Sequence, residues 1–372
     1  MGLRRLLAKC AAAAVAERAA ALLSPLQVGV GIRGGAEAVV HAARQVMEGK
    51  EGVHLLQGDL INAFNVVERN EMLLQVKEHF PSLLPWAITC YGAPSNLKFG
   101  TEDIMSNTGL HQGDPLASLF FALTLHPIIL TIRDSVPDLD LNVWYLDDGC
   151  VIGTIPQLSQ VVDILRRDGP ARGLILSTSH TVQAPARPKT TVWSPSDSTG
   201  DENPLAWGVT RIEESGIILL GAAVGNSAYV AGVLEEKVDK ITEATALLPT
   251  IEDAHTEFAL ARSTLTLPKF MFSLRTTPTT DHTIILDQFD TTTKEALGRI
   301  MGCPLPPSRS SRPSSPSLWA AWGSGRRPTT RRRPTPPPSS PPRTWSGPCC
   351  PPPRTPPPPP SPPPSSPPST PA

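Results

Sequence analysis

The composition of the chain changes abruptly at Pro304. Of the 43 prolines in the 372 residues, 27 lie between residues 304 and 372, together with nine arginines and no lysine, aspartate or glutamate. A sequence so rich in proline has few backbone donors, and it has too few apolar side chains to offset the entropy that folding costs. We therefore expect a folded body in residues 1–303 and a disordered, proline-rich tail in residues 304–372 with polyproline II character.

The body is acidic, and its apolar content is high enough for a sizeable core. It carries 24 Lys and Arg against 34 Asp and Glu, a formal charge of −10 that the nine tail arginines nearly offset. Its cysteines form no CxxC pair, which disfavours a zinc site and fits a reducing compartment, the nucleus or the cytoplasm. Charged residues interrupt the apolar N-terminal stretch too early for a membrane span, so an amphipathic helix is a simpler interpretation than a mitochondrial presequence.

The hydrophobic pattern of the body predicts helices and strands in an irregular order, which is typical of an α+β fold. Helices are expected at residues 3–23, 36–49, 68–80, 84–92, 114–135, 155–169, 231–248 and 254–266. Strands are expected at residues 53–60, 189–193 and 216–225, and hairpins at residues 96–109 and 141–154.

The second hairpin carries the sequence WYLDDG at residues 144–149, in which Asp147 and Asp148 are adjacent. Asp-Gly is a good turn, so an ordinary acidic turn is one interpretation. The apolar flanks LNVWYL and CVIG argue against it, because two neighbouring carboxylates on a buried hairpin repel each other and lose hydration. A bound divalent cation would relieve both costs.

A third acid, Asp59, ends the apolar run VHLLQGDL. It could cap a helix that starts at INAFN, or it could meet Asp147 across adjacent strands as a second metal-binding carboxylate. Between these acids lies SNTGLHQGDPLASLFFAL (residues 106–123). Its glycines would let a nucleotide approach the backbone, and Asp114-Pro115 would start the long apolar helix as N-cap and first residue.

These three blocks, in this order, resemble the reverse transcriptase domain of non-LTR (LINE-like) retrotransposons. GDLINAFN is similar to motif A of that family, GLHQGDPLASLFFAL to motif B and YLDDG to motif C. The segments QVGVGIRGGAEAVVHA, GLIL, PKTTVW and GIILLGAAVG are similar to its fingers segment and its motifs D and E. The resemblance implies a right-hand polymerase with partial fingers in residues 1–52, an antiparallel palm in 53–225 and a helical thumb in 226–303.

The resemblance also implies catalytic roles. Asp59, Asp147 and Asp148 would bind two Mg²⁺ ions, with Mn²⁺ as a substitute, for the transfer of a nucleotide from a dNTP to a primer 3′-OH. Lys189 would be the motif D lysine that protonates pyrophosphate, whereas a solvated strand lysine is the simpler interpretation of the residue.

Other residues would bind the substrates that the resemblance implies, which are dNTPs and an RNA or DNA template with its primer. Phe64 would be the steric gate against a ribose 2′-OH, and Leu60, Gln112 and Gly113 would contact the incoming nucleotide. Tyr145 and Gly149 would lie near the primer end. The candidates for strand contacts are basic: Arg166, Arg167, Arg172, Arg187, Lys237 and Lys240.

Three alternatives stay open at this point. The basic fingers segment of the family has no counterpart before residue 3, so an inactive fragment is one expectation. A non-catalytic nucleic-acid or adaptor protein is another, since PPPRTPPPPP in the tail has the composition that SH3 and WW domains bind. An RNA-templated RNA polymerase is a third, which the bulky Phe64 disfavours because a ribonucleotide needs room for its 2′-OH.

Overall fold

The computed structural model describes residues 2–181, 189–195 and 207–303, all within one compact unit, Met1–Gly323. The predicted disordered tail lies outside the described residues. The α-helices are α1 Gly2–Leu23, α2 Gly35–Gly49, α3 Ala63–Val66, α4 Arg69–His79, α5 Leu84–Tyr91, α6 Ala117–Ser135, α7 Ile155–Asp168, α8 Ser227–Ala246, α9 Ala254–Leu260, α10 Leu267–Thr276 and α11 Thr283–Met301. The strands are β1 His54–Gly58, β2 Ser95–Phe99, β3 Glu102–Ser106, β4 Leu141–Tyr145, β5 Asp148–Gly153, β6 Thr191–Trp193, β7 Thr210–Ile212, β8 Gly216–Leu219 and β9 Ala222–Gly225.

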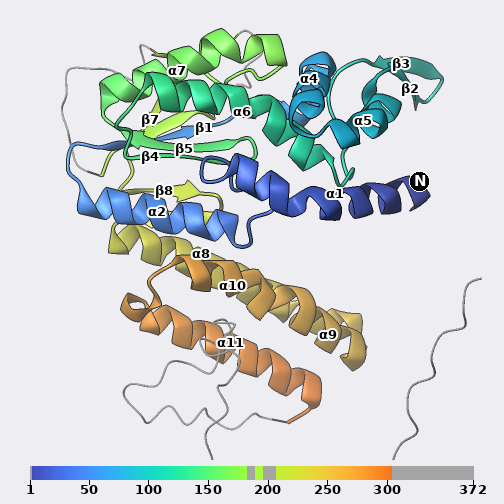
Figure 1. Ribbon diagram of the computed structural model, residues 1–372. Coiled ribbons are helices and arrows are strands. Elements are labelled where there is room, and N and C mark those ends of the chain that lie inside the picture. The colour runs from blue at the N-terminus through green and yellow to red at the C-terminus, as the bar shows by residue number, and fades with distance from the viewer. Residues whose placement is uncertain (1, 182–188, 196–206, 304–372) are drawn as a thin grey trace, which may run out of the picture. The chain divides into compact units, whose positions relative to one another are not determined.

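The central sheet has five strands in the order β4-β5-β1-β6-β7, with helices on both faces (Figure 1). β1 lies in the middle and runs antiparallel to both β5 and β6. The sheet is not wholly antiparallel as predicted, because β7 pairs with β6 in parallel. The predicted mixture of helices and antiparallel strands is otherwise what the structure contains.

The alternating directions of the side chains along β1 explain why both faces of the sheet are covered. Leu56 belongs to one core cluster with residues of α6 and α7, whereas its neighbour Leu55 belongs to another with residues of α2 and the β8–β9 hairpin. Successive side chains of a strand point to opposite faces, so a continuous apolar run requires cover on each side. The apolar segment at residues 53–60 therefore makes the central strand.

Helix α6 is the most buried helix of the body and supports one face of the sheet. By length and composition it could cross a membrane, but 67 % of its apolar window is buried inside the protein, as in the core helix of a globular fold. It begins at Ala117 with Leu116 as N-cap, and not at the predicted Asp114-Pro115. Asp114 instead accepts hydrogen bonds from the Leu116 N–H (3.0 Å) and the Tyr91 hydroxyl (2.6 Å).

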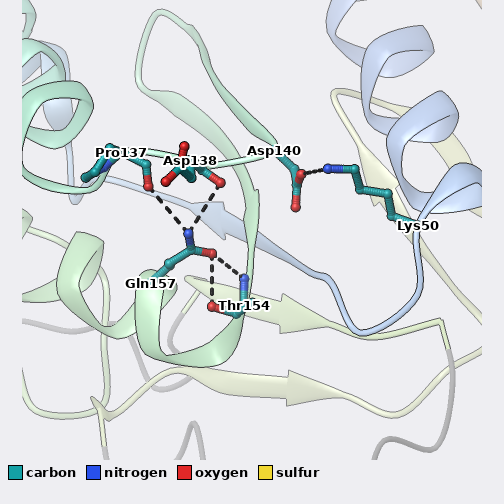
Figure 2. Close-up of polar contacts among 6 residues, drawn as sticks. All are labelled: Lys50, Pro137, Asp138, Asp140, Thr154 and Gln157. Carbon is teal, nitrogen blue, oxygen red and sulfur yellow. Dashed lines mark hydrogen bonds and ion pairs between the residues drawn. The ribbon is translucent and has the colours of Figure 1, made fainter.

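Two polar contacts hold the segment that leads into β4 (Figure 2). Gln157, the third residue of α7, accepts from the Thr154 N–H (2.8 Å) in a capping box and donates to the Asp138 carbonyl (3.3 Å). Lys50, which follows α2, forms an ion pair with Asp140. Elements on both faces of the sheet thus fix where β4 starts.

Residues 216–225, predicted as one strand, form the β8–β9 hairpin instead. Its turn is Leu220-Gly221, with φ of 49° and 84°. The predicted helix at 254–266 is also divided, into α9 and a π-helical segment, Ala261–Leu265. Helices α8, α10 and α11 share a core cluster that includes Phe270 and Phe289, whose rings stack 4.6 Å apart.

Candidate active site

The turn between β4 and β5 consists of two residues, Leu146 and Asp147. The strand register pairs Tyr145 with Asp148, so Asp148 and Gly149 already belong to β5 and do not form the predicted Asp-Gly turn. Leu146 has a φ of 56°, a value that is uncommon for a residue with a side chain. The turn therefore presents Asp147 at its tip and Asp148 at the first position of the next strand.

Gly149 serves packing in this arrangement. A Cβ at this position would lie 2.7 Å from the indole ring of Trp144, the residue opposite it in the ladder. Trp144 is fully buried, and its Nε1–H donates to Asn142 (3.0 Å). The glycine thus admits the tryptophan beneath the turn, and its predicted contact with a primer stays a prediction.

A buried glutamine, which the sequence analysis did not single out, holds the turn. Gln27 is fully buried and its Nε2 donates to the Leu146 carbonyl (3.0 Å). Its Oε1 accepts from the Leu146 N–H (2.7 Å) and from the Gly29 N–H (3.0 Å). The signal in the sequence was a lone Gln in the apolar stretch LQVGVG, which in hindsight suggests a buried polar group with a dedicated partner.

Asp59 lies beside Asp148 because the register of the central strands places it there. Gly58 pairs with Gly149, so the residue that follows Gly58 comes next to the residue that precedes Gly149. The backbone of Asp59 is held by Ser177, whose N–H donates to its carbonyl (2.9 Å). Its interpretation as a helix N-cap is wrong, because α3 begins at Ala63 with Asn62 as its N-cap.

The three carboxylates and Lys189 form one electrostatic group. Burial, then the charges of Asp147 and Asp59, raise the pKa of Asp148 to about 6, and Lys189 opposes the shift. Burial also raises the pKa of Asp59 and of Asp147, and the Lys189 charge opposes both shifts. Lys189 itself is exposed. The four residues therefore converge, and the acids carry an electrostatic cost that the protein only partly compensates.

The donor set suits a hard divalent cation in kind, since carboxylate oxygens are the ligands that Mg²⁺ and Mn²⁺ prefer. The side chains do not yet form a closed site, because within the described residues no three His, Cys, Asp or Glu groups are close enough to hold one ion.

The glycine loop lies against the segment that follows Asp59. The Gly109 N–H donates to the Val67 carbonyl (2.8 Å), and the Leu110 N–H donates to that of Phe64 (2.7 Å). A Cβ at Gly109 would lie 2.2 Å from the Asn65 carbonyl oxygen, so Gly109 serves this packing and not the approach of a ligand. Gly113, with a φ of 85°, has open space around it.

Two neighbouring side chains support this loop. Arg69 is buried and donates to the carbonyls of Gly109 (2.9 Å) and Ser106 (2.8 Å). Tyr91 is also buried and stacks on His111, with ring centroids 4.7 Å apart. The exposed Gln112 thus stands on a loop whose base is fixed.

The two remaining residues predicted to contact the nucleotide, Phe64 and Leu60, differ in how deeply they are buried. Phe64 is half-buried, and its ring stacks on Phe121 at 4.6 Å with 13° between the planes. Leu60 is 4 % exposed and bridges to Leu176, so its side chain is a core residue with no surface to offer a nucleotide.

An open cleft of about 570 Å³ adjoins the acids. Its lining comes from the sheet, the β8–β9 hairpin, α2 and α10, and the residues are Ala36, Gln57, Tyr145, Asp148, Ile218, Leu220, Gly221 and Phe272. Tyr145 and Asp148 thus form one wall of a space whose other wall is apolar.

The basic residues predicted to contact a nucleic-acid strand mostly bind other parts of the body. Of the five that the structure describes, the partners are Trp207 and Thr178 for Arg166, Asp168 for Arg167, Glu71 for Arg172, Gly221 and Ser273 for Lys237, and Glu236 for Lys240. Arg187 lies outside the described residues. Surface ion pairs are weak, so those at Arg167 and Lys240 do not prevent a contact with phosphate.

No protein-family model and no curated protein matches the sequence. The solved structures that are similar to the chain include two telomerases, each at 12 % identity. Telomerase from Candida albicans, in complex with the TWJ fragment of telomeric RNA, has a TM-score of 0.44 over 80 % of this chain and 53 % of its own. Apo telomerase from Candida tropicalis has a TM-score of 0.40 over 80 % and 54 %. The chain thus spans about half the length of these telomerases, and the likeness does not single out non-LTR retrotransposons.

Proposed function

We propose that the chain is an RNA-directed DNA polymerase domain of the non-LTR type, which transfers a nucleotide from a dNTP to a primer 3′-OH. The observation that carries the proposal is the convergence of Asp59, which follows β1, with Asp147 of the β4–β5 turn and Asp148 at the start of β5. Burial raises the pKa of each, and the charges of neighbouring acids raise the pKa of Asp59 and Asp148 further, which is an electrostatic cost. A purely structural hairpin has no need to carry this cost.

Asp59, Asp147 and Asp148 would hold two Mg²⁺ ions, or Mn²⁺ in their place. When bound, such ions activate the attacking hydroxyl and neutralise the leaving pyrophosphate. The protein contributes position: the β1–β5 register sets Asp59 beside Asp148, and the amide of Gln27 sets the turn that carries Asp147. Positioning of this kind is the main protein contribution to phosphoryl transfer.

The other residues around the acids have roles that follow from their places. Lys189, exposed and electrostatically coupled to all three acids, would give a proton to the pyrophosphate. Gln112 and Gly113, on the open side of the glycine loop, would contact the incoming nucleotide. Phe64, held by Phe121, would exclude the ribose 2′-OH.

The cleft beside Asp148 would receive the end of the primer. Tyr145 lines it from the sheet, and the apolar side chains of Leu220 and Phe272 line it from the opposite wall. In this proposal residues 1–52 act as partial fingers, residues 53–225 as the palm and residues 226–303 as the thumb.

The test is primer extension on poly(rA)/oligo(dT) with dTTP and Mg²⁺. We expect incorporation by the wild-type chain and none by Asp147→Ala, with Asp163→Ala, an exposed aspartate of α7, as the control that keeps activity. Equal incorporation by wild type and Asp147→Ala would refute the site, and no incorporation by either would favour an inactive fragment.

A further inference from the structure

Two cationic side chains, one from α2 and one from α8, each connect α10 to the β8–β9 hairpin. Arg44 of α2 donates to the carbonyls of Thr276, in α10, and Ala223, in β9 (2.5 and 2.9 Å). Lys237 of α8 donates to the Ser273 hydroxyl, in α10, and to the carbonyl of Gly221 in the hairpin turn (both 2.9 Å). Each cation therefore joins the same two elements.

The contact of Arg44 satisfies the C-terminal end of α10. The last carbonyls of a helix have no partner within the helix and carry the negative end of its dipole, so a cation stabilises them. Arg44 is only 7 % exposed, and burial lowers its pKa. One turn earlier on α2, the His41 ring nitrogen lies 2.8 Å from the Arg275 carbonyl oxygen, which adds a second contact from α2 to the same helix end.

Lys237 completes the bridge on the other side. It is half-buried, and desolvation lowers the pKa of its ammonium. Its hydrogen-bond partners are a carbonyl and a hydroxyl, and the charge of the neighbouring Glu236 offsets the loss of hydration only in part. The contact fixes the backbone of Gly221, which is the second residue of the turn at the tip of the hairpin.

The apolar wall of the cleft adjoins the residues that Lys237 joins, since Phe272 precedes Ser273 and Leu220 precedes Gly221. Phe272 of α10 and Leu220 and Gly221 of the turn line it, and Tyr145 and Asp148 face them from the sheet. We infer that Arg44 and Lys237 are positioning residues that hold Phe272 and the β8–β9 turn as one wall, against which the recessed end of a primer–template duplex lies. This inference rests on the proposed function and adds the residues that shape its binding cleft.

The test measures the affinity of the full chain for a fluorescent primer–template duplex by anisotropy. Nine tail arginines bind any nucleic acid electrostatically, so an excess of unlabelled blunt duplex and moderate salt isolate the binding of the recessed end. The variants are Lys237→Met, its conservative partner Lys237→Arg, and Arg44→Lys. Lys77→Met, which removes one exposed cation from α4, is the control.

We expect Lys237→Met to bind the recessed end about tenfold more weakly, because a small displacement of a positioning element is costly at a binding site. Lys237→Arg and Lys77→Met should bind like wild type, and the thermal midpoint of Lys237→Met should stay within a few degrees of the wild-type value. In primer extension the KM for primer should rise, while the KM for dNTP and kcat at saturating primer stay unchanged.

Unchanged duplex affinity in Lys237→Met and Arg44→Lys would overturn the inference, even if hydrogen exchange at the hairpin rises. A wild-type chain that does not bind the recessed end would also overturn it. A wild-type chain that binds the end but extends no primer would refute the proposed activity alone, and the binding comparison among the variants would still decide the inference.

Discussion

The side-chain amide of Gln27 forms hydrogen bonds with both backbone polar groups of Leu146. Its Nε2 donates to the Leu146 carbonyl at 3.0 Å, and its Oε1 accepts from the Leu146 N–H at 2.7 Å. Leu146 adopts a φ of 56°, and the residue after it is Asp147. An uncommon backbone conformation persists only where its surroundings impose it. The position of Asp147 therefore depends on Gln27, which lies 119 positions before Leu146 in the chain.

Replacing Gln27 with leucine should destabilise the protein. The change leaves the half-buried N–H and C=O of Leu146 without their partner, at a cost of about 2 kcal/mol in the free energy of unfolding. Urea denaturation monitored by tryptophan fluorescence measures it. Gln160→Leu, on the exposed side of α7, should change stability by less than about 0.5 kcal/mol. Equal stabilities for the two variants would contradict the structural role of Gln27.

His126 should make the stability of the body depend on pH. It is 5 % exposed in α6, its Nδ1 has no hydrogen-bond partner among the described residues, and burial lowers its pKa. The unfolded chain therefore takes up the proton first. The neutral ring is fully compatible with the fold above pH 6.5, and stability is lost as the pH falls below that value.

Urea denaturation at pH 7 and pH 5 checks this dependence. His126→Leu should lose less stability than wild type between these two pH values, because it removes a group that the unfolded state protonates more readily than the folded state does. The exposed His255→Leu should keep the wild-type difference. A His126→Leu variant with the full wild-type difference would show that this histidine is not the source.

The elements that carry the acids could be predicted because their signals are local. The apolar run before Asp59 and the paired runs around Asp147 each indicate a strand within a few residues. The contacts of Gln27 with Leu146, and those of Arg44 and Arg69, could not be predicted, since these partners lie 37 or more positions away and only the packed structure brings them together. The prediction of a single strand at residues 216–225 was wrong for a related reason. The apolar run is continuous, and only the backbone conformation of Leu220-Gly221 reveals the turn.

The packing of Gly149 against Trp144 can be tested by adding one methyl group. Gly149→Ala should cost about 1–3 kcal/mol, because its Cβ would lie 2.7 Å from the indole, and forced overpacking costs that much. The smaller ring of Trp144→Phe should relieve the clash, so the double variant should lose less stability than the sum of the single variants. A double-mutant cycle from urea denaturation measures this coupling, and strict additivity would rule out the contact.

Phe64 should control the choice between dNTPs and rNTPs if it is the steric gate. Phe64→Val should raise the ratio of rUTP to dTTP incorporation, since the smaller side chain leaves room for a 2′-OH. It should also lose stability, because the stacking on Phe121 alone contributes about 0.5–1.5 kcal/mol. Single-nucleotide incorporation assays give the ratio. Phe99→Val, on the exposed β2–β3 hairpin, should keep the wild-type preference, and an unchanged ratio in Phe64→Val would remove Phe64 from nucleotide selection.

Divalent metal should stabilise the protein through the three acids, and this can be measured without any activity. A ligand that binds only the folded state stabilises it, by about 1.4 kcal/mol at ten times its Kd. For a body of this size that corresponds to a rise of about 2 °C in the thermal midpoint. The stability of Asp148→Asn should differ from that of wild type in two respects. Without metal it should be more stable than wild type, because it removes a carboxylate that burial and two neighbouring acids disfavour. With Mg²⁺ its midpoint should rise less, because one ligand is missing.

The control is Asp163→Asn, which replaces an exposed aspartate of α7. Its midpoint should match that of wild type both with Mg²⁺ and with EDTA. If all three proteins gain the same stability from Mg²⁺, the ion binds elsewhere, and Asp59, Asp147 and Asp148 are not its ligands.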